Sequence, residues 1–204
     1  MGDWETDSLL FAHQQALNTL TERYSRFLRL GLLQNRSADE TARVLQEQLA
    51  GLPVTSVTAD NGPEFARHEA VSRALRVPFF FCHPYSSWEK GTVENTNGLV
   101  RCYLPRRTDL RKITQQDLEE IADELNHRPR KCLGYRTPSE VLLQSGVALG
   151  IRIQEVAEKD VARHGFDGAH VDWGCFARYS LISLRNSGLS RIGPKSGSFL
   201  AFFL

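Results

Sequence analysis

The feature that most constrains the fold is an alternation of short β-branched or apolar segments with longer amphipathic ones. Segments typical of strands come first and are then separated by segments typical of helices. The predicted strands cover residues 4–11, two pieces of 17–33 broken near "ERYSR", 54–59 and 77–84. The predicted helices cover 37–49, 63–75, the stretch after Gly91, and 114–129. This order favours an α/β sheet that helices cover on both faces.

Two of the predicted helices carry start signals. Ser37 and Glu40 form the S-x-x-E pattern of a capping box, in which each side chain bonds the other residue's backbone N–H. Thr114 is the predicted cap of the helix 114–129, and Pro129 ends it.

Composition excludes several classes of protein. The 204 residues suit one domain, or one domain with an appendage, and the net charge of +1 means that any DNA binding must come from local clusters. No signal peptide is visible, and no apolar run reaches the roughly 20 residues of a membrane span. The four cysteines are scattered without a CxxC pair, which argues against a zinc cage and fits a reducing compartment. We therefore expect a cytoplasmic protein with no membrane partner.

Three carboxylates occupy positions from which they can meet at one edge of the sheet. Asp7 lies within the first predicted strand, Asp60 closes the strand "VTSVTAD", and Glu94 opens a helix. Each has an ordinary explanation as well, since "DNG" is a common turn and acids are favoured at helix starts. An aspartate inside a strand is less ordinary, because Asp is depleted there and costly to bury without a partner.

Carboxylates in this arrangement suit a hard divalent cation. Mg²⁺ prefers oxygen ligands and is commonly held by a few carboxylates together with substrate phosphates. Two such ions, about 4 Å apart, can activate an attacking oxygen and stabilise a leaving one in phosphodiester chemistry. The sequence therefore admits a metal-dependent phosphodiester reaction.

Five stretches, in order along residues 2–143, resemble the integrase core of bacterial insertion-sequence transposases. They read "GDWETD", "LTERYSRF", "TADNGPEFARH", "FFFCHPYSSWEKGTVENTNGLVRCYLP" and "ELNHRPRKCLGYRTPSEVL". The resemblance is to the group called IS-thirty, in the superfamily that includes retroviral integrases. It implies an RNase H-like fold, α/β with a five-stranded mixed sheet flanked by helices, and a catalytic triad at Asp7, Asp60 and Glu94 that binds two Mg²⁺ or Mn²⁺ ions.

The resemblance also implies an activity and partners. The activity is DNA cleavage and strand transfer in transposition, which implies a nucleoid-associated protein. The partners are DNA, both transposon ends and target, and further copies of the chain. Asp3 competes with Asp7 as the first acid, because both lie on one strand face. We favour Asp7, since the acid in this superfamily commonly follows a tryptophan by three residues, and Trp4 stands there.

Six residues are candidates for DNA contacts. Asn97 and Arg101 follow Glu94 at i+3 and i+7, so they share its helix face. The segment "RPRKCLGYR" adds four basic residues, which are Arg128, Arg130, Lys131 and Arg136. Such residues can contact phosphates without reading sequence. A solvated arginine on the helix, or a basic loop that packs its aliphatic stems, explains the same residues equally simply.

The chain departs from the family at both ends. Family members carry a helix-turn-helix region before the core, whereas this sequence begins at Met1, so we expect a transposase truncated at its N-terminus. We expect the integrase-like core at 1–145, and a poorly packed tail without family resemblance at 146–204, with a possible helix at 151–163. The alternatives are an inactive remnant that only binds DNA or the full-length transposase, an RNase H-like nuclease with another substrate, and a structural α/β domain.

Overall fold

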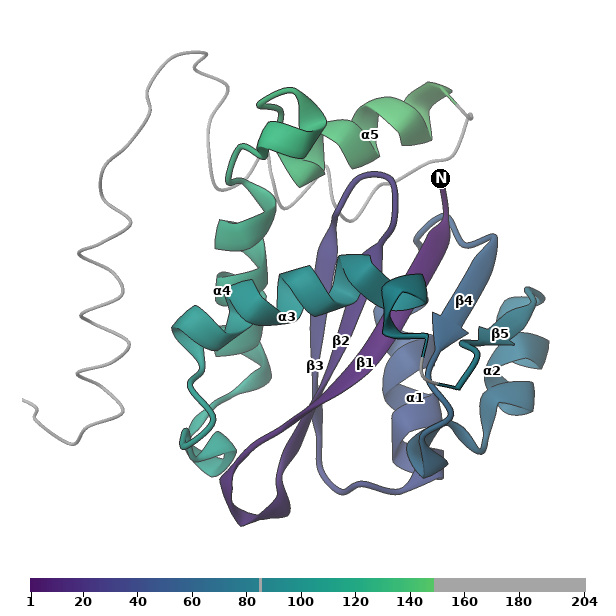
Figure 1. The fold of residues 1–204 in the computed structure, drawn as a ribbon, viewed down its shortest axis with the longest axis vertical. Helices are drawn as coiled ribbons and strands as arrows, with labels where there is room; N and C mark the ends of the chain where they lie inside the picture. The colour runs from purple at the N-terminus through teal and green to yellow at the C-terminus, as the bar shows by residue number, and fades with distance from the viewer. Residues whose placement is uncertain (85, 149–204) are drawn as a thin grey trace, which may run out of the picture. The chain divides into compact units, whose positions relative to one another are not determined.

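A computed structural model describes residues 1–84 and 86–148 of the protein, and the account below refers to those residues (Figure 1). The expectations for the tail and for a helix at 151–163 concern residues that lie outside this part of the chain, apart from 146–148. Within the described part, no helix is long and apolar enough to cross a membrane.

The centre of the fold is a five-stranded mixed sheet in the order β3-β2-β1-β4-β5. The strands are β1 (Asp3–Leu10), β2 (Ala16–Glu22), β3 (Leu28–Leu33), β4 (Ser56–Ala59) and β5 (Phe79–Phe81). The first three form an antiparallel meander, whereas β4 pairs with β1, and β5 with β4, in parallel. Strand β5 is shorter than the predicted 77–84, because its last residue, Phe81, pairs with Ala59, where β4 itself ends, and Pro78 before it cannot donate a ladder hydrogen bond.

Five α-helices accompany the sheet, and the one near the C-terminal end of the described part was not anticipated from the sequence. They are α1 (Ala38–Leu49), α2 (His68–Leu75), α3 (Gly91–Tyr103), α4 (Gln115–Asn126) and α5 (Pro138–Ala148). The predicted helix 63–75 divides into a 3-10 turn, Pro63–Phe65, and α2, which starts only at His68. Helix α4 follows the prediction closely, with a complete capping box between Thr114 and Asp117.

Helices cover both faces of the sheet, as expected, because side chains of successive strand residues point to opposite faces. Helix α3 crosses one face and α1 lies behind the other (Figure 1). One core combines strand residues with residues of α1, α2 and α5, and includes Trp4, Leu20, Leu45, Leu49, Val57, Phe65, Val71 and Leu142. The other combines strand residues with residues of α3 and α4, and includes Leu9, Leu17, Leu28, Val100, Leu118, Ile121 and Leu125.

The tryptophan of β1 also ties two strands together. Trp4 is fully buried, and its indole Nε1–H donates to the carbonyl of Pro53, 2.9 Å away, just before β4. Asp7 lies three residues further on and shares the opposite face with Leu9, on the side of α3 and α4.

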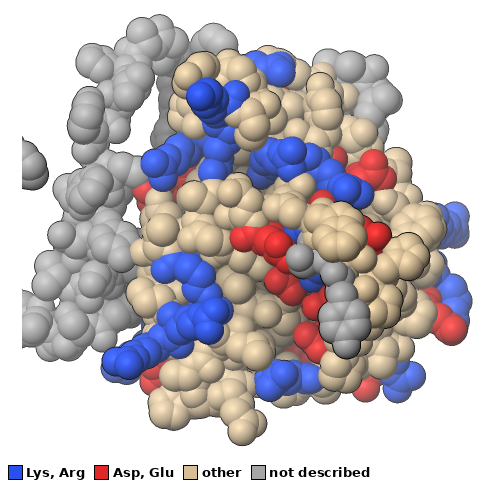
Figure 2. Space-filling model, viewed as in Figure 1, with Lys and Arg blue, Asp and Glu red and all other residues tan. Residues whose placement is uncertain are grey.

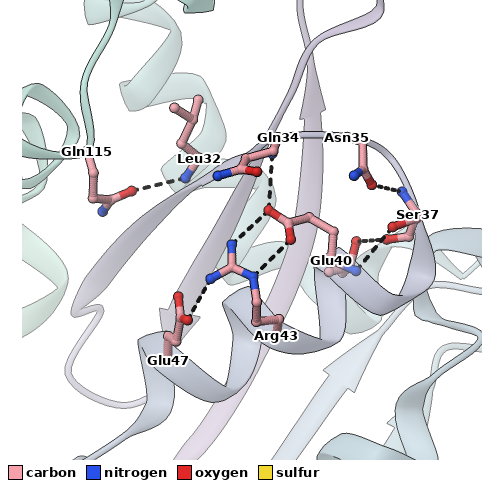
Figure 3. Close-up of polar contacts among 9 residues, drawn as sticks. Leu32, Gln34, Asn35, Ser37, Glu40, Arg43, Glu47 and Gln115 are labelled. Carbon is pink, nitrogen blue, oxygen red and sulfur yellow. Dashed lines mark hydrogen bonds and ion pairs between the residues drawn. The ribbon is translucent and has the colours of Figure 1, made fainter.

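The start of α1 shows that the predicted capping box is only half formed (Figure 3). Ser37 Oγ accepts the Glu40 N–H at 3.2 Å, as expected. The Glu40 carboxylate, however, accepts the Gln34 N–H and pairs with Arg43, which lies one turn further along and offers a charged partner. Asn35 Oδ1 instead accepts the Ser37 N–H at 2.9 Å.

Candidate active site

The pairing of β1 with β4 brings Asp7 and Asp60 to the same level of the sheet. The parallel register aligns Asp3 with Ser56 and Glu5 with Thr58, and the same offset continues to Asp7 and Asp60. Both carboxylates remain partly exposed, with 23% of the Asp7 side chain and 46% of the Asp60 side chain accessible. Two acids that lie 53 positions apart in sequence thus become neighbours.

Lys90 bridges the two carboxylates. Its Nζ lies 3.2 Å from Asp7 Oδ1 and 3.3 Å from Asp60 Oδ2, and its side chain is only 7% exposed. Burial alone would lower the pKa of Lys90, but the two carboxylate charges and the hydrogen bonds to them outweigh burial, so its pKa is raised above the usual value. One ammonium group therefore lies between two acids and offsets part of their charge.

Neutral groups hold the remaining oxygen of each acid. Asn97 Nδ2 donates to Asp7 Oδ2 at 2.7 Å, and the Gly62 N–H donates to Asp60 Oδ1 at 3.1 Å within the turn that follows β4. The "DNG" turn and the presentation of Asp60 are therefore one structural feature. Each carboxylate has one oxygen fixed by a neighbour and the other directed at the shared cation.

Helix α3 is anchored to β1 beside the acids. Glu5, which is completely buried, accepts the Val93 N–H of the first helical turn at 2.9 Å and forms an ion pair with Arg23. A carboxylate at this position also matches the positive end of the helix dipole. The bond from Val93 to Glu5 therefore holds the start of α3 against β1, at a residue two positions before Asp7.

Glu94 lies on α3 between the two residues that contact Asp7. Lys90, Glu94 and Asn97 are spaced by four and three positions, so they share one helical face. Glu94 itself is exposed, and no group of three or more His, Cys, Asp or Glu residues in the described chain is placed to hold a metal ion. The structure thus brings together two of the three predicted acids and leaves the third one on the adjoining helix.

The two candidates for the first acid lie at different places. Asp3 Oδ1 accepts the hydroxyl hydrogens of Ser56 and Thr55, at 2.6 and 2.9 Å, beside the start of β4. These two bonds lower the pKa of Asp3, the Ser56 bond most strongly. Of the two aspartates, only Asp7 shares Lys90 with Asp60.

Three of the six residues predicted to contact DNA are buried or half-buried and make hydrogen bonds within the protein. Asn97 is buried against Asp7. Arg101 Nη2 donates to the carbonyl of Leu10, and its guanidinium lies 4.3 Å from the centre of the Phe11 ring. Arg130 Nη2 donates to the carbonyl of Leu125, and burial lowers the pKa of Arg130.

The other three face solvent to a greater degree. Arg128, Lys131 and Arg136 are exposed, although Arg136 also donates to the carbonyl of Leu133. On the face shown in Figure 2, acidic side chains gather near the centre and Lys and Arg side chains lie around them. DNA contacts by all six residues stay predictions.

Sequence reasoning missed Lys90 and Glu5. Lys90 stands four residues before Glu94 and seven before Asn97, and this spacing is the signal that could have placed it on the same face. Glu5 stands two residues before Asp7, so the period of a strand puts both acids on one face.

Comparisons with known proteins relate this chain to transposases. The chain is 39% identical over 146 residues to the transposase of insertion sequence element IS4351 from Bacteroides fragilis, and 44% identical over 148 residues to that of IS1086 from Cupriavidus metallidurans. It is 38% identical over 152 residues to the transposase InsI of element IS30A from Escherichia coli K12. These alignments cover 70–73% of this chain but only 39–45% of the relatives, so the chain spans less than half of their length. No protein-family model matches the chain.

Solved structures show the same fold. The catalytic core domain of BIV integrase superposes with a TM-score of 0.59 at 20% identity, covering 73% of this chain and 98% of that one. An intasome structure of simian T-cell lymphotropic virus, in complex with a PP2A regulatory subunit, gives a TM-score of 0.56 at 20% identity, covering 67% of this chain and 52% of that one. The sheet and helices are thus those of an integrase catalytic core, which is RNase H-like.

Proposed function

Because the chain is a homologue of the IS30-type transposases and has the fold of an integrase catalytic core, we propose that it carries a metal-dependent site for DNA cleavage and strand transfer. Asp7 and Asp60 would hold the metal from β1 and β4, and Glu94 would complete the site from α3. The observation that carries the proposal is the approach of one oxygen from each aspartate to a single cation, the Lys90 ammonium, at 3.2 and 3.3 Å.

The residues present fit Mg²⁺ or Mn²⁺. The two aspartates supply the hard oxygen ligands that these ions prefer, and the two oxygens that contact Lys90 already face one shared position. Asn97, whose Nδ2 donates to Asp7, also has a buried Oδ1 without a hydrogen-bond partner in the described chain. When bound, the metal supplies activation of the attacking oxygen and stabilisation of the leaving oxygen of a phosphodiester.

The protein's own part in the reaction is to position these ligands. Asn97 fixes the orientation of the Asp7 carboxylate, and the Gly62 N–H fixes that of Asp60. The bond from Val93 to Glu5 keeps the helix that carries Glu94 against the same strand. Such preorganised ligands need little rearrangement during the reaction.

DNA is the proposed substrate and partner, and further copies of the chain are proposed to assemble with it. Both follow from the homology, and the site chemistry agrees, since carboxylate-bound Mg²⁺ also binds phosphate oxygens. Sedimentation of the chain with and without DNA would measure the oligomer.

Nicking of supercoiled plasmid in Mn²⁺ tests the proposal without knowledge of the transposon ends. We expect nicked product from the wild type and none from Asp60→Asn or Glu94→Gln. Glu69→Gln, which changes an exposed acid of α2, should nick as the wild type does.

Two results would count against this function. Nicking that persists in both site variants would place the activity elsewhere. DNA binding without any nicking in Mn²⁺ would instead favour the inactive remnant.

A further inference from the structure

We propose that Lys90 is an internal counter-ion that occupies the cation position between Asp7 and Asp60 until a divalent metal displaces it. This inference rests on the proposed function, because it takes Asp7 and Asp60 as the metal ligands. It adds a competition within the chain itself, between a tethered ammonium group and a free metal ion.

The ammonium and the metal cannot be bound together. Lys90 Nζ uses Asp7 Oδ1 and Asp60 Oδ2, the same two oxygens that remain after Asn97 and Gly62 have taken the others. Mg²⁺ binds oxygen at about 2.0–2.1 Å, so the carboxylates would draw in by about 1 Å relative to their distance from Nζ. No room for Nζ is left between them.

Without metal, the two acids need such a partner. Like charges that share a partly buried site repel one another, and removing one partner of a buried ion pair leaves a charge uncompensated. Lys90 has 7% of its side chain exposed, so its ammonium is positioned by the protein and is not a solvated surface charge. The lysine therefore keeps the acids in place before metal arrives.

Lys90 can leave without moving the rest of the site. It ends a single 3-10 turn, Ser87–Lys90, on the N-terminal side of the Val93–Glu5 anchor, whereas Glu94 and Asn97 lie on the C-terminal side. A lysine side chain has a flexible four-carbon stem, so rotation about its bonds suffices to withdraw Nζ. The anchored helix can keep its position throughout.

The first test compares Mn²⁺ affinity, measured by titration calorimetry on the full chain, between the wild type and Lys90→Met. Methionine keeps much of the apolar stem and removes the charge. If lysine is withdrawn in about a tenth of the molecules, the apparent affinity of the wild type is lowered about tenfold, so Lys90→Met should bind about tenfold more tightly. Lys112→Met, which changes an exposed lysine, should match the wild type.

The outcomes separate the two proposals. Binding by the wild type that is lost in Asp60→Asn, with equal or weaker binding in Lys90→Met, would overturn the counter-ion and leave the metal site standing. Absence of Mn²⁺ binding in the wild type and in Lys90→Met alike would overturn both.

A second test needs no variant and so does not depend on the folding of Lys90→Met. Acetylation of lysines by an amine-reactive ester, read by mass spectrometry, reports the accessibility of each side chain. We expect acetylation of Lys90 to rise several-fold when Mg²⁺ is added, while that of Lys112 stays constant. Equal labelling of Lys90 with and without Mg²⁺, at concentrations that saturate the metal site, would overturn the proposal.

Discussion

Among single residues, Asp3 and Asp7 show how position along one strand separates two chemically identical side chains. Both lie on the face of β1 that carries Glu5, yet Asp3 accepts from two hydroxyls beside the start of β4 while Asp7 meets Lys90 and Asn97. Asp3 is thereby bound into the strand pairing, and Asp7 is left with an oxygen directed at a cation.

The lowered pKa of Asp3 leads to a prediction about acid stability. A carboxyl group whose pKa is lower in the folded state stabilises the fold at pH values above its pKa in the unfolded chain, near 3.9. That stability is lost as the pH falls through the pKa of the folded state. Asp3→Asn should therefore be less stable than the wild type at pH 6, and the difference should shrink below about pH 4. Urea denaturation at pH 6 and pH 3 measures it. A difference that is the same at both pH values would contradict the assigned hydrogen bonds.

The sequence supports the placement of Asp7 and Asp60 because each lies in or directly after a recognisable strand. It could not place Lys90, because the contact depends on a pairing across 83 positions and on the path of a loop. The same limit applies to the bond from Asn97 to Asp7, because the sequence indicates only that Asn97 shares the helix face of Glu94. Its contact with DNA stays a prediction.

At the scale of elements, the contact between β3 and α1 depends on the absence of a side chain. A Cβ at Gly31 would lie 2.5 Å from Val44 Cγ1 and 2.8 Å from Gln48 Nε2. Gln48 in turn accepts a hydrogen bond from Asn18 of β2 at 2.6 Å. Because Gly31 has no side chain, α1 lies close enough to the sheet for Gln48 to reach Asn18.

Gly31→Ala should consequently lower the free energy of unfolding by about 1–3 kcal/mol, since it overpacks a buried contact. Gly98→Ala is the matched control, because a Cβ there meets nothing within 4 Å. Alanine is also the better helix former, so this control should raise stability by about 0.5–1 kcal/mol. Chemical denaturation of both variants gives the comparison. If Gly31→Ala proved as stable as the wild type, α1 would have to pack further from the sheet.

Most elements follow from periodicity, but their ends depend on competition between local partners. The Ser37 cap was predicted, whereas the partner of Glu40 was not, because Arg43 and the Gln34 N–H compete for the same carboxylate. The late start of α2 likewise shows that a proline at a tolerated first-turn position does not itself fix where an α-helix begins.

At the scale of the whole molecule, a net charge of +1 gives little long-range attraction to DNA. Binding would then depend on a few exposed cations. Arg101, Arg130 and Arg136 donate hydrogen bonds to backbone carbonyls of the protein. Arg128 and Lys131 are exposed and are therefore the better candidates.

The double variant Arg128→Gln/Lys131→Gln should weaken DNA binding. The plot of log association constant against log salt concentration should become less steep by about 2, since each phosphate contact contributes about 0.9 to the slope. Its melting temperature should not change, because both side chains are exposed. Arg36→Gln/Arg76→Gln removes the same charge from exposed positions near α1 and α2 and is the control. Fluorescence anisotropy over a salt series measures the slope. Equal slopes for the two double variants would exclude the loop 128–136 as a DNA contact.

The indole of Trp4 has a consequence for the opposite side of the sheet. Its bond to Pro53 joins β1 to the segment that enters β4, so a fully buried ring supports the pairing of the two strands from the face opposite Asp7. The conformational entropy of bringing the two aspartates together is thus lost once, while the chain folds. A ligand arriving later meets two strands that are already paired, so its affinity is spent on adjusting two side chains and not on bringing the strands together.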